Sequence, residues 1–152
     1  MKQDVVPVQI RGILPANSGC ALFVGNDEKV FVINVEPQMG QIIGMFLRDA
    51  PKERPLTHDL INRMFQGFGI SVERVVITDL KNSTYFARII LQQQNELARK
   101  IVELDARPSD CLALAAAQKK PIFVSTPLFE QVEDMSEVLN KMNDSGSETS
   151  DE

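Results

Sequence analysis

Apolar residues follow two different spacings along this chain of 152 residues, and the change from one to the other constrains the fold. In residues 5–14, Val6, Val8 and Ile10 occupy every second position, which is typical of a half-buried strand. After Thr57, apolar side chains return every three or four positions, which indicates an amphipathic helix. A chain that switches repeatedly between these spacings must pack helices against a sheet.

The same patterns predict the order of the elements. Strands are expected at residues 5–14, 20–24, 30–35, 71–79, 84–92, 97–104 and 121–125. Helices are expected at residues 37–48, from Thr57 to about Gly67 and from Pro108, with one or two weaker helices within residues 128–142. Pro7 predicts that the first strand lies at the edge of the sheet, and Thr57 is a favourable N-cap. The order predicts an α+β fold, with helices packed on a mixed and mostly antiparallel sheet.

Composition sets the expected size and charge of the domain. Apolar residues make up 43% and charged residues 24% of the chain, which is ordinary for a soluble globular protein. We expect one domain over residues 1–142 and a disordered acidic tail over residues 143–152. Four of the 21 acidic residues lie in that tail, which leaves 17 acids against 16 bases and argues against a purely electrostatic grip on nucleic acid.

Cysteine use and the N-terminus indicate a cellular compartment. Cys20 and Cys111 are the only cysteines, and neither belongs to a Cys-x-x-Cys pair, so we expect two buried thiols in a reducing compartment. Residues 1–6 lack the basic and apolar regions of a secretory signal. No stretch reaches the roughly 20 apolar residues that a membrane helix needs. We therefore expect a cytoplasmic protein that does not bind a membrane.

The first polar cluster, Arg54-Pro55-Leu56-Thr57-His58-Asp59, lies at the predicted start of the second helix and holds the only histidine. Helix N–H groups favour a neutral imidazole there, and a neutral imidazole can act as a general base or bind a metal. The alternative is structural: Asp59 would complement the helix dipole and pair with Arg63, while His58 covers the helix end. On these residues alone, the structural interpretation is favoured.

The second cluster, Asp105-Ala106-Arg107-Pro108-Ser109-Asp110, spans a predicted strand-to-helix junction. Strand alternation would make Asp105 and Arg107 project together, and Asp110 would fall at the third helical position. Asp105 and Asp110 could then hold Mg²⁺ or Mn²⁺ against a phosphodiester that Arg107 grips with two hydrogen bonds. Equally, Arg107 could be locked by Asp105 or Asp110 and simply fix the corner of the chain.

Three stretches together resemble the bifunctional nuclease domain family: residues 54–60, Tyr85-Phe86-Ala87, and residues 105–110 followed by Leu112-Ala113-Leu114-Ala115. The resemblance runs from about Val5 to Ser125. It implies a compact α+β domain that is usually intracellular and often self-associates, so we expect a homodimer. Plant relatives are described as degrading both RNA and DNA. The matched polar positions are Arg54, Thr57, His58, Asp59, Asp105, Arg107, Ser109 and Asp110.

The chain departs from the family pattern at the first predicted helix. Many relatives show a glycine and a glutamate there, whereas this chain has Glu36-Pro37-Gln38-Met39-Gly40. Cys111 also stands where alanine is usual, which is a small change at a position expected to be packed.

The resemblance and the two clusters predict a metal-assisted nuclease that acts on RNA or DNA. Asp105 and Asp110 would hold the cation, and His58 would activate water or protonate the leaving oxygen. Asp59 would orient His58, and Arg107 would stabilise charge on the phosphate. Substrate would also be bound by Arg54, Thr57 and Ser109.

Two other functions stay open. A non-catalytic binding or assembly module with an anion-binding surface agrees with the near-neutral body, the acidic tail and the lack of a basic stripe. A small-molecule phosphohydrolase is a weaker third alternative. The nuclease mechanism depends on His58 and the cluster around Arg107 meeting in one accessible hollow.

Overall fold

The computed structural model describes the backbone of residues 4–149 and the side chains of residues 4–144. Within these residues a seven-stranded sheet has the order β3-β2-β1-β7-β4-β5-β6. The strands are β1 (Val5–Ala16), β2 (Gly19–Gly25), β3 (Val30–Val35), β4 (Ile70–Lys81), β5 (Thr84–Gln94), β6 (Arg99–Ala106) and β7 (Ile122–Ser125). The helices are α1 (Pro37–Leu47), α2 (Thr57–Gly67), α3 (Pro108–Gln118), α4 (Thr126–Gln131) and α5 (Ser136–Thr149).

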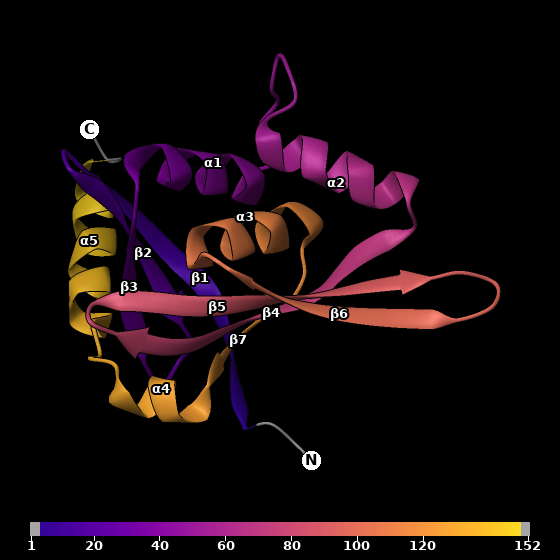
Figure 1. Ribbon diagram of the computed structural model, residues 1–152. Helices are drawn as coiled ribbons and strands as arrows, with labels where there is room; N and C mark the ends of the chain where they lie inside the picture. The colour runs from indigo at the N-terminus through magenta and orange to yellow at the C-terminus, as the bar shows by residue number, and fades with distance from the viewer. Residues whose placement is uncertain (1–3, 150–152) are drawn as a thin grey trace.

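The pairing of the strands confirms the predicted fold class. β4 and β7 are parallel, and every other neighbouring pair is antiparallel, so the sheet is mixed and mostly antiparallel. Helices α1, α2 and α3 lie together on one side of the sheet (Figure 1). We call this side the helix face and the other side the open face. None of the helices among the described residues is long and apolar enough to cross a membrane.

Pro7 does not mark an edge strand, because β1 lies inside the sheet between β2 and β7. The prediction that β1 is an edge strand was wrong. The reason for it, that proline lacks an N–H for the ladder, still explains why Pro7 fits at this position. Pro7 pairs with Phe123 of β7, whereas the pairing of β1 with β2 begins only at Gln9. At Pro7 the strand therefore has a neighbour on one side only, where a missing N–H leaves no ladder bond unmade.

The core lies between the sheet and its helices. On the helix face it joins Leu22 and Ile33 to Ile43 of α1 and Leu112 of α3, all at most 2% exposed. A smaller cluster on the open face packs Leu139 of α5 against β2 and β3. Both cysteines are buried free thiols, as predicted, and burial raises the pKa of Cys111 to about 12.

Helix α2 is only partly covered. Ile61 and Phe65 pack against the core, but Leu60, Met64 and Phe68 are 53%, 49% and 71% exposed. The N-cap lies one residue earlier than predicted. Leu56 is the N-cap and Thr57 is the first helical residue, because the Asp59 carboxylate accepts the Leu56 N–H at 2.8 Å and closes the first turn.

The C-terminal helix extends into the expected tail. Asp134 Oδ1 accepts the backbone N–H groups of Val30 and Ser136, at 3.1 and 3.0 Å, and so ties the start of α5 to β3. The helix continues through Thr149 and so includes residues 143–149 of the segment expected as a tail, whose disorder stays a prediction. Residues 150–152 of that segment lie outside the described residues.

Candidate functional site

Two helices on the helix face begin directly after strands, and each starts with proline. Glu36 precedes Pro37 of α1, and Arg107 precedes Pro108 of α3. A residue before proline favours extended backbone, which Glu36 and Arg107 both adopt, and proline at the first helical position loses no hydrogen bond. The two starts lie side by side, since Arg107 Nη1 is 3.8 Å from Glu36 Oε1.

The guanidinium of Arg107 is connected to the histidine of the other cluster. Arg107 Nε donates to Asp110 Oδ2 at 3.1 Å, and His58 Nε2 lies 2.9 Å from Asp110 Oδ1. An ionised carboxylate only accepts hydrogen bonds, so Nε2 of His58 carries the proton of this contact. The structure thus joins two motifs 52 positions apart, through Asp110 and not through Asp105.

Accessibility divides this group of residues. The side chains of Arg107, Asp110 and Glu36 are 63%, 33% and 72% exposed. His58 is only 5% exposed, and its Nδ1 is buried without a hydrogen-bond partner among the described residues. Its ring and that of Phe46 of α1 meet in a T-shaped arrangement, with ring centroids 6.4 Å apart. Solvent therefore reaches Arg107 and scarcely reaches His58, which contacts Asp110 from inside the molecule.

The opposite charges of Asp110 and Arg107 stabilise each other. Burial alone would raise the pKa of Asp110, but hydrogen bonds from His58 and Arg107 outweigh it and leave that pKa below its ordinary value. The hydrogen bond to Asp110 raises the pKa of Arg107 in turn. Asp110 therefore stays ionised, and the guanidinium is held in one orientation.

Asp105 lies on the open face of the sheet. It stands opposite Arg88 of β5, next to the pair formed by Ala87 and Ala106, and both of those alanines pack into the core of the helix face. Alternation along β6 then turns Asp105 away from that core. With Phe86, Arg88 and Glu103 it lines a hollow of about 420 Å³. The expected projection of Asp105 with Arg107 fails because β6 ends at Ala106, where strand alternation stops.

This arrangement does not fit the predicted cation site. Asp105 and Asp110 belong to different faces, and both oxygens of Asp110 already accept hydrogen bonds. Among the described residues, no three His, Cys, Asp or Glu side chains gather as a metal would require. Glu36 is the functional candidate that the sequence analysis missed, and its position directly before a helix-starting proline, as for Arg107, is the signal that could have found it.

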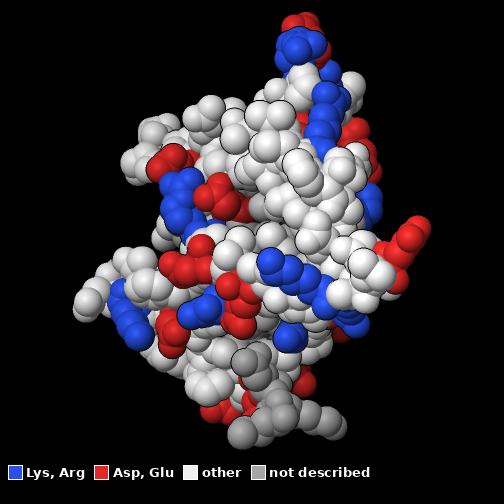
Figure 2. Space-filling model, turned by 45° about the vertical axis from the view of Figure 1, so that its right-hand side comes forward, with Lys and Arg blue, Asp and Glu red and all other residues white. Residues whose placement is uncertain are grey.

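The other predicted site residues have separate places. Asp59 pairs with Lys52 at 3.5 Å and caps α2, and it orients neither His58 nor Arg63. Ser109 is 8% exposed, inside the first turn of α3. Arg54 is exposed in the loop before α2. Figure 2 shows acidic and basic side chains interleaved across the middle of one face, without a continuous basic area on that face.

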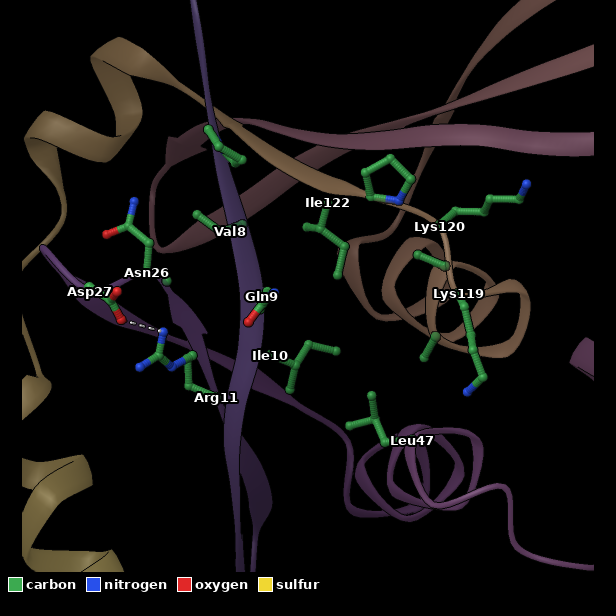
Figure 3. Close-up of a pocket in the computed structure, with 15 residues that line it drawn as sticks. Val8, Gln9, Ile10, Arg11, Asn26, Asp27, Leu47, Lys119, Lys120 and Ile122 are labelled. Carbon is green, nitrogen blue, oxygen red and sulfur yellow. Dashed lines mark hydrogen bonds and ion pairs between the residues drawn. The ribbon is translucent and has the colours of Figure 1, made fainter.

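A larger hollow, of about 790 Å³, lies away from this site at the other ends of α1 and α3. Ile10, Leu47 and Ile122 surround it, and Lys119 stands at one side (Figure 3). Lys119 pairs with Asp49 at 3.2 Å, so the carboxylate of Asp49 already neutralises its charge. Of the three stretches that resemble the family, the hollow is lined only by Ala115 and by none of their polar residues.

The fold and these motifs agree with the sequence comparison. Residues 22–137 match the bifunctional nuclease domain family, and the chain belongs to that family. It is 30% identical over 129 residues to an uncharacterised protein of Mycobacterium tuberculosis, which covers 84% of this chain and 74% of the relative. It is 31% identical over 80 residues to bifunctional nuclease 1 of Oryza sativa subsp. japonica, 52% of this chain and 24% of the plant protein. The bifunctional nuclease of Oryza minuta matches to the same extent, 31% over 80 residues.

Proposed function

We propose that this protein is a nuclease, which hydrolyses phosphodiester bonds of RNA or DNA on the surface around Arg107. Membership of the family and the names of the rice relatives support the reaction class. The observation that carries the location is the exposed guanidinium of Arg107, held by a carboxylate that the buried His58 anchors in turn.

Arg107 binds the phosphate in this mechanism. Its Nε is engaged by Asp110, but the guanidinium has further N–H donors that face solvent. Such a fork can hold two phosphate oxygens and stabilise the negative charge that grows on them during attack at phosphorus. Asp110 and His58 are positioning residues, because they fix the orientation of the guanidinium before substrate arrives.

Glu36 accepts the proton of the attacking water. Its carboxylate is 72% exposed and lies 3.8 Å from Arg107 Nη1, so a water beside a phosphate bound to Arg107 is within its reach. The water oxygen forms the new bond to phosphorus, its proton passes to Glu36, and the bond to the leaving oxygen breaks. Solvent protonates that oxygen. This is the role that the sequence analysis gave to His58.

Dependence on Mg²⁺ or Mn²⁺ is a separate prediction. Asp105 and Asp110 do not form a shared site, so no step above uses a cation. Activity should be measured with each metal and with a chelator, on single-stranded RNA and DNA, and on free nucleotides to test the phosphohydrolase alternative.

Arg107→Gln is the decisive variant. It removes the charge and the fork, so kcat/KM should fall by about 10²-fold, and Arg107→Lys should restore only part of the loss. Arg88→Gln is the matched control, because Arg88 is a half-exposed arginine paired with Glu103 on the open face. Full activity of a folded Arg107→Gln protein would exclude this site.

Glu36→Gln tests the general base. A general base must be ionised, so the wild-type rate should fall on the acidic side of its pH profile. The variant should lose that acidic limb as well as most of its rate, while substrate binding, measured by fluorescence anisotropy, stays close to wild type. An unchanged pH profile would remove Glu36 from the mechanism.

A second function is a non-catalytic module that binds anions through the same guanidinium. The burial of His58 and the engagement of both Asp110 oxygens favour it, because neither group is then free for acid–base chemistry. It predicts salt-dependent oligonucleotide binding that Arg107→Gln weakens, with no hydrolysis under any metal condition.

A further inference from the structure

The hollow on the open face gathers two residues that the site around Arg107 leaves unused. Phe86 belongs to the second stretch that resembles the family, and Asp105 begins the third. The hollow measures about 420 Å³, within the range of roughly 300–1,000 Å³ for sites that take small organic ligands. Its lining joins the buried Val76 to an exposed aromatic ring and to charged groups, a combination that suits a flat molecule with polar edges.

The strand register places this hollow next to the Arg107 site. The last pair of β5 and β6 is Ala87 with Ala106, and one further step brings Phe86 to the level of Arg107, where β6 has ended. The Cα atoms of Asp105 and Arg107 are at most about 7 Å apart, because two residues of extended chain span no more. A ligand that reaches from Arg107 into the hollow therefore needs only the length of one nucleotide.

Phe86 offers an aromatic surface to such a ligand. It follows Tyr85 and precedes Ala87, which packs into the core of the helix face, so strand alternation turns Phe86 toward the open face. The residue is 40% exposed, and Lys81 Nζ lies 5.9 Å from its ring centre. Stacking of a nucleobase on an aromatic ring is worth more than an exposed cation contact of this kind, so a base can displace Lys81 from the ring.

Asp105 supplies a free acceptor beside that ring. Its carboxylate makes no hydrogen bond or ion pair with any other described residue. Arg88 and Glu103 also line the hollow, but they pair with each other at 3.6 Å. Asp105 is therefore available to hold the polar edge of a base that stacks on Phe86.

The donors of the base decide which base fits a carboxylate. An ionised carboxylate has two acceptor oxygens and no donor. On its Watson–Crick edge, guanine presents two adjacent donors, N1–H and the 2-amino group. Adenine and cytosine present one donor beside a bare ring nitrogen, and uracil and thymine present one N–H between two carbonyl oxygens. Guanine alone therefore matches both oxygens without a repulsive contact.

We propose that this hollow binds an unpaired guanine base, which stacks on Phe86 and donates N1–H and its 2-amino group to Asp105 while its phosphate lies on Arg107. The preferred substrate is then a single strand that contains guanine, because base pairing in a duplex occupies the same edge. Phe86 and Asp105 determine specificity and take no part in breaking the bond. The inference rests on the proposed function for the place of the phosphate, but the binding of the base needs no hydrolysis.

Equilibrium binding of nucleoside 3′,5′-bisphosphates to the full chain, measured by isothermal titration calorimetry, is the first test. The guanosine compound should bind about tenfold more tightly than those of adenosine, cytidine and uridine. The inosine compound, which lacks the 2-amino group, should have an intermediate affinity. Equal affinities for all of these compounds, or no measurable binding, would overturn the proposal.

Variants assign the preference to its residues. Asp105→Asn should abolish the preference for guanosine, whereas the matched control Asp79→Asn should keep it, because Asp79 pairs with Phe86 from β4, on the side away from β6. Phe86→Ala should weaken binding of every compound about tenfold, since stacking does not distinguish the bases. Arg107→Gln should also weaken all of them equally, because it contacts phosphate alone. A preference that survives Asp105→Asn, or that Asp79→Asn removes, would contradict the assignment.

The positions of cleavage in single-stranded oligonucleotides separate this inference from the proposed function. The cuts should lie next to guanine, and Asp105→Asn should spread them over all bases while it retains most of the rate on a mixed sequence, in contrast to Arg107→Gln. Cuts without base preference would overturn the guanine site and leave the nuclease in place. Guanosine-selective binding without hydrolysis would overturn the nuclease and leave the guanine site in place.

Discussion

The two halves of the sheet differ in how completely the chain covers them. The half formed by β1, β2 and β3 has α1 on one face and α5 on the other, and its edge is tied down by Asp134 and Met135. The half formed by β4, β5 and β6 is covered mainly by α2 and α3 on the helix face, while α4 contacts β4. It leaves Phe86, Ile101 and Leu104 at least 40% exposed.

This difference predicts that substitutions in the covered half affect stability, whereas substitutions in the open half affect function. In the covered half, a Cβ added at Gly25 or Gly40 would lie closer than 3.0 Å to its neighbours, so a small change in volume should be costly. In the open half and at the junction with α3, charged groups remain accessible, so changes there should alter binding and pH response more than folding. The predictions below, from the largest effect to the smallest, test this division.

The largest effect is expected at Gly40, where α1 crosses β2. A Cβ at this position would lie 2.3 Å from Cys20 Sγ, which forces the helix away from the sheet. Gly40→Ala should lower the free energy of unfolding by about 3 kcal/mol, as overpacked core positions do. Urea denaturation measures it. In the control, Gly67→Ala, nothing lies within 4 Å of the new Cβ, and stability should not fall. Equal stability of both variants would show that the covered half is loosely packed.

A smaller loss is expected at Asp110. Asp110→Ala leaves the buried Nε2 of His58 without its acceptor, which should cost about 2 kcal/mol of unfolding free energy. Asp27→Ala is the control, because Asp27 is 97% exposed and pairs with Arg11 on the surface. The control should change stability by no more than about 0.5 kcal/mol. If both variants unfold at the same urea concentration, the His58–Asp110 contact does not support the fold.

Lys29 tests the link between β3 and α4. Its Nζ donates to the carbonyl oxygens of Phe129 at 2.7 Å and Val132 at 3.1 Å. Lys29→Met should cost about 1 kcal/mol by removing these bonds at the helix end. Lys120→Met, at a lysine whose side chain makes no hydrogen bond or ion pair with the described residues, should leave the melting temperature unchanged. A loss in Lys120→Met as large as that in Lys29→Met would contradict the assignment.

The smallest effect is expected in how the free energy of unfolding depends on acidic pH through Asp110. The native pKa of Asp110 lies below its ordinary value of 3.8, so its ionised form favours the folded state. That contribution is complete above the unfolded pKa and disappears as the pH falls through the native pKa. Between about pH 5 and pH 3, wild type should therefore lose stability more steeply than Asp110→Asn. Parallel curves from urea titrations at several pH values would refute the linkage.

The order of the elements could be predicted because it depends on local spacing. β3 begins and ends where the pattern of Val30 to Val35 places it, and α1 and α3 begin at the two prolines that open them. Boundaries moved where a tertiary or capping contact intervened. Thr57 became the first helical residue because the Asp59 carboxylate reaches the Leu56 N–H.

The site was predictable in its members and not in its geometry. His58, Arg107 and Asp110 were all named, but spacing could not show that Asp110 joins the other two or that His58 is buried. Asp105 was assigned to the site by extending strand alternation past Ala106, where the chain turns into α3. Glu36 was missed because its partner lies 71 positions along the chain, and only the packing of α1 beside α3 brings the two together.

The amino-acid sequence by itself determined the fold class, the family and the residues available for chemistry, because periodicity and helix-start signals are local properties. The tertiary structure alone decided which of those residues contact each other and which of them are accessible to solvent. Those outcomes depend on which helix starts lie side by side and on the face to which each strand turns a side chain. Both are set by packing between segments far apart in the chain, which no short stretch of residues encodes.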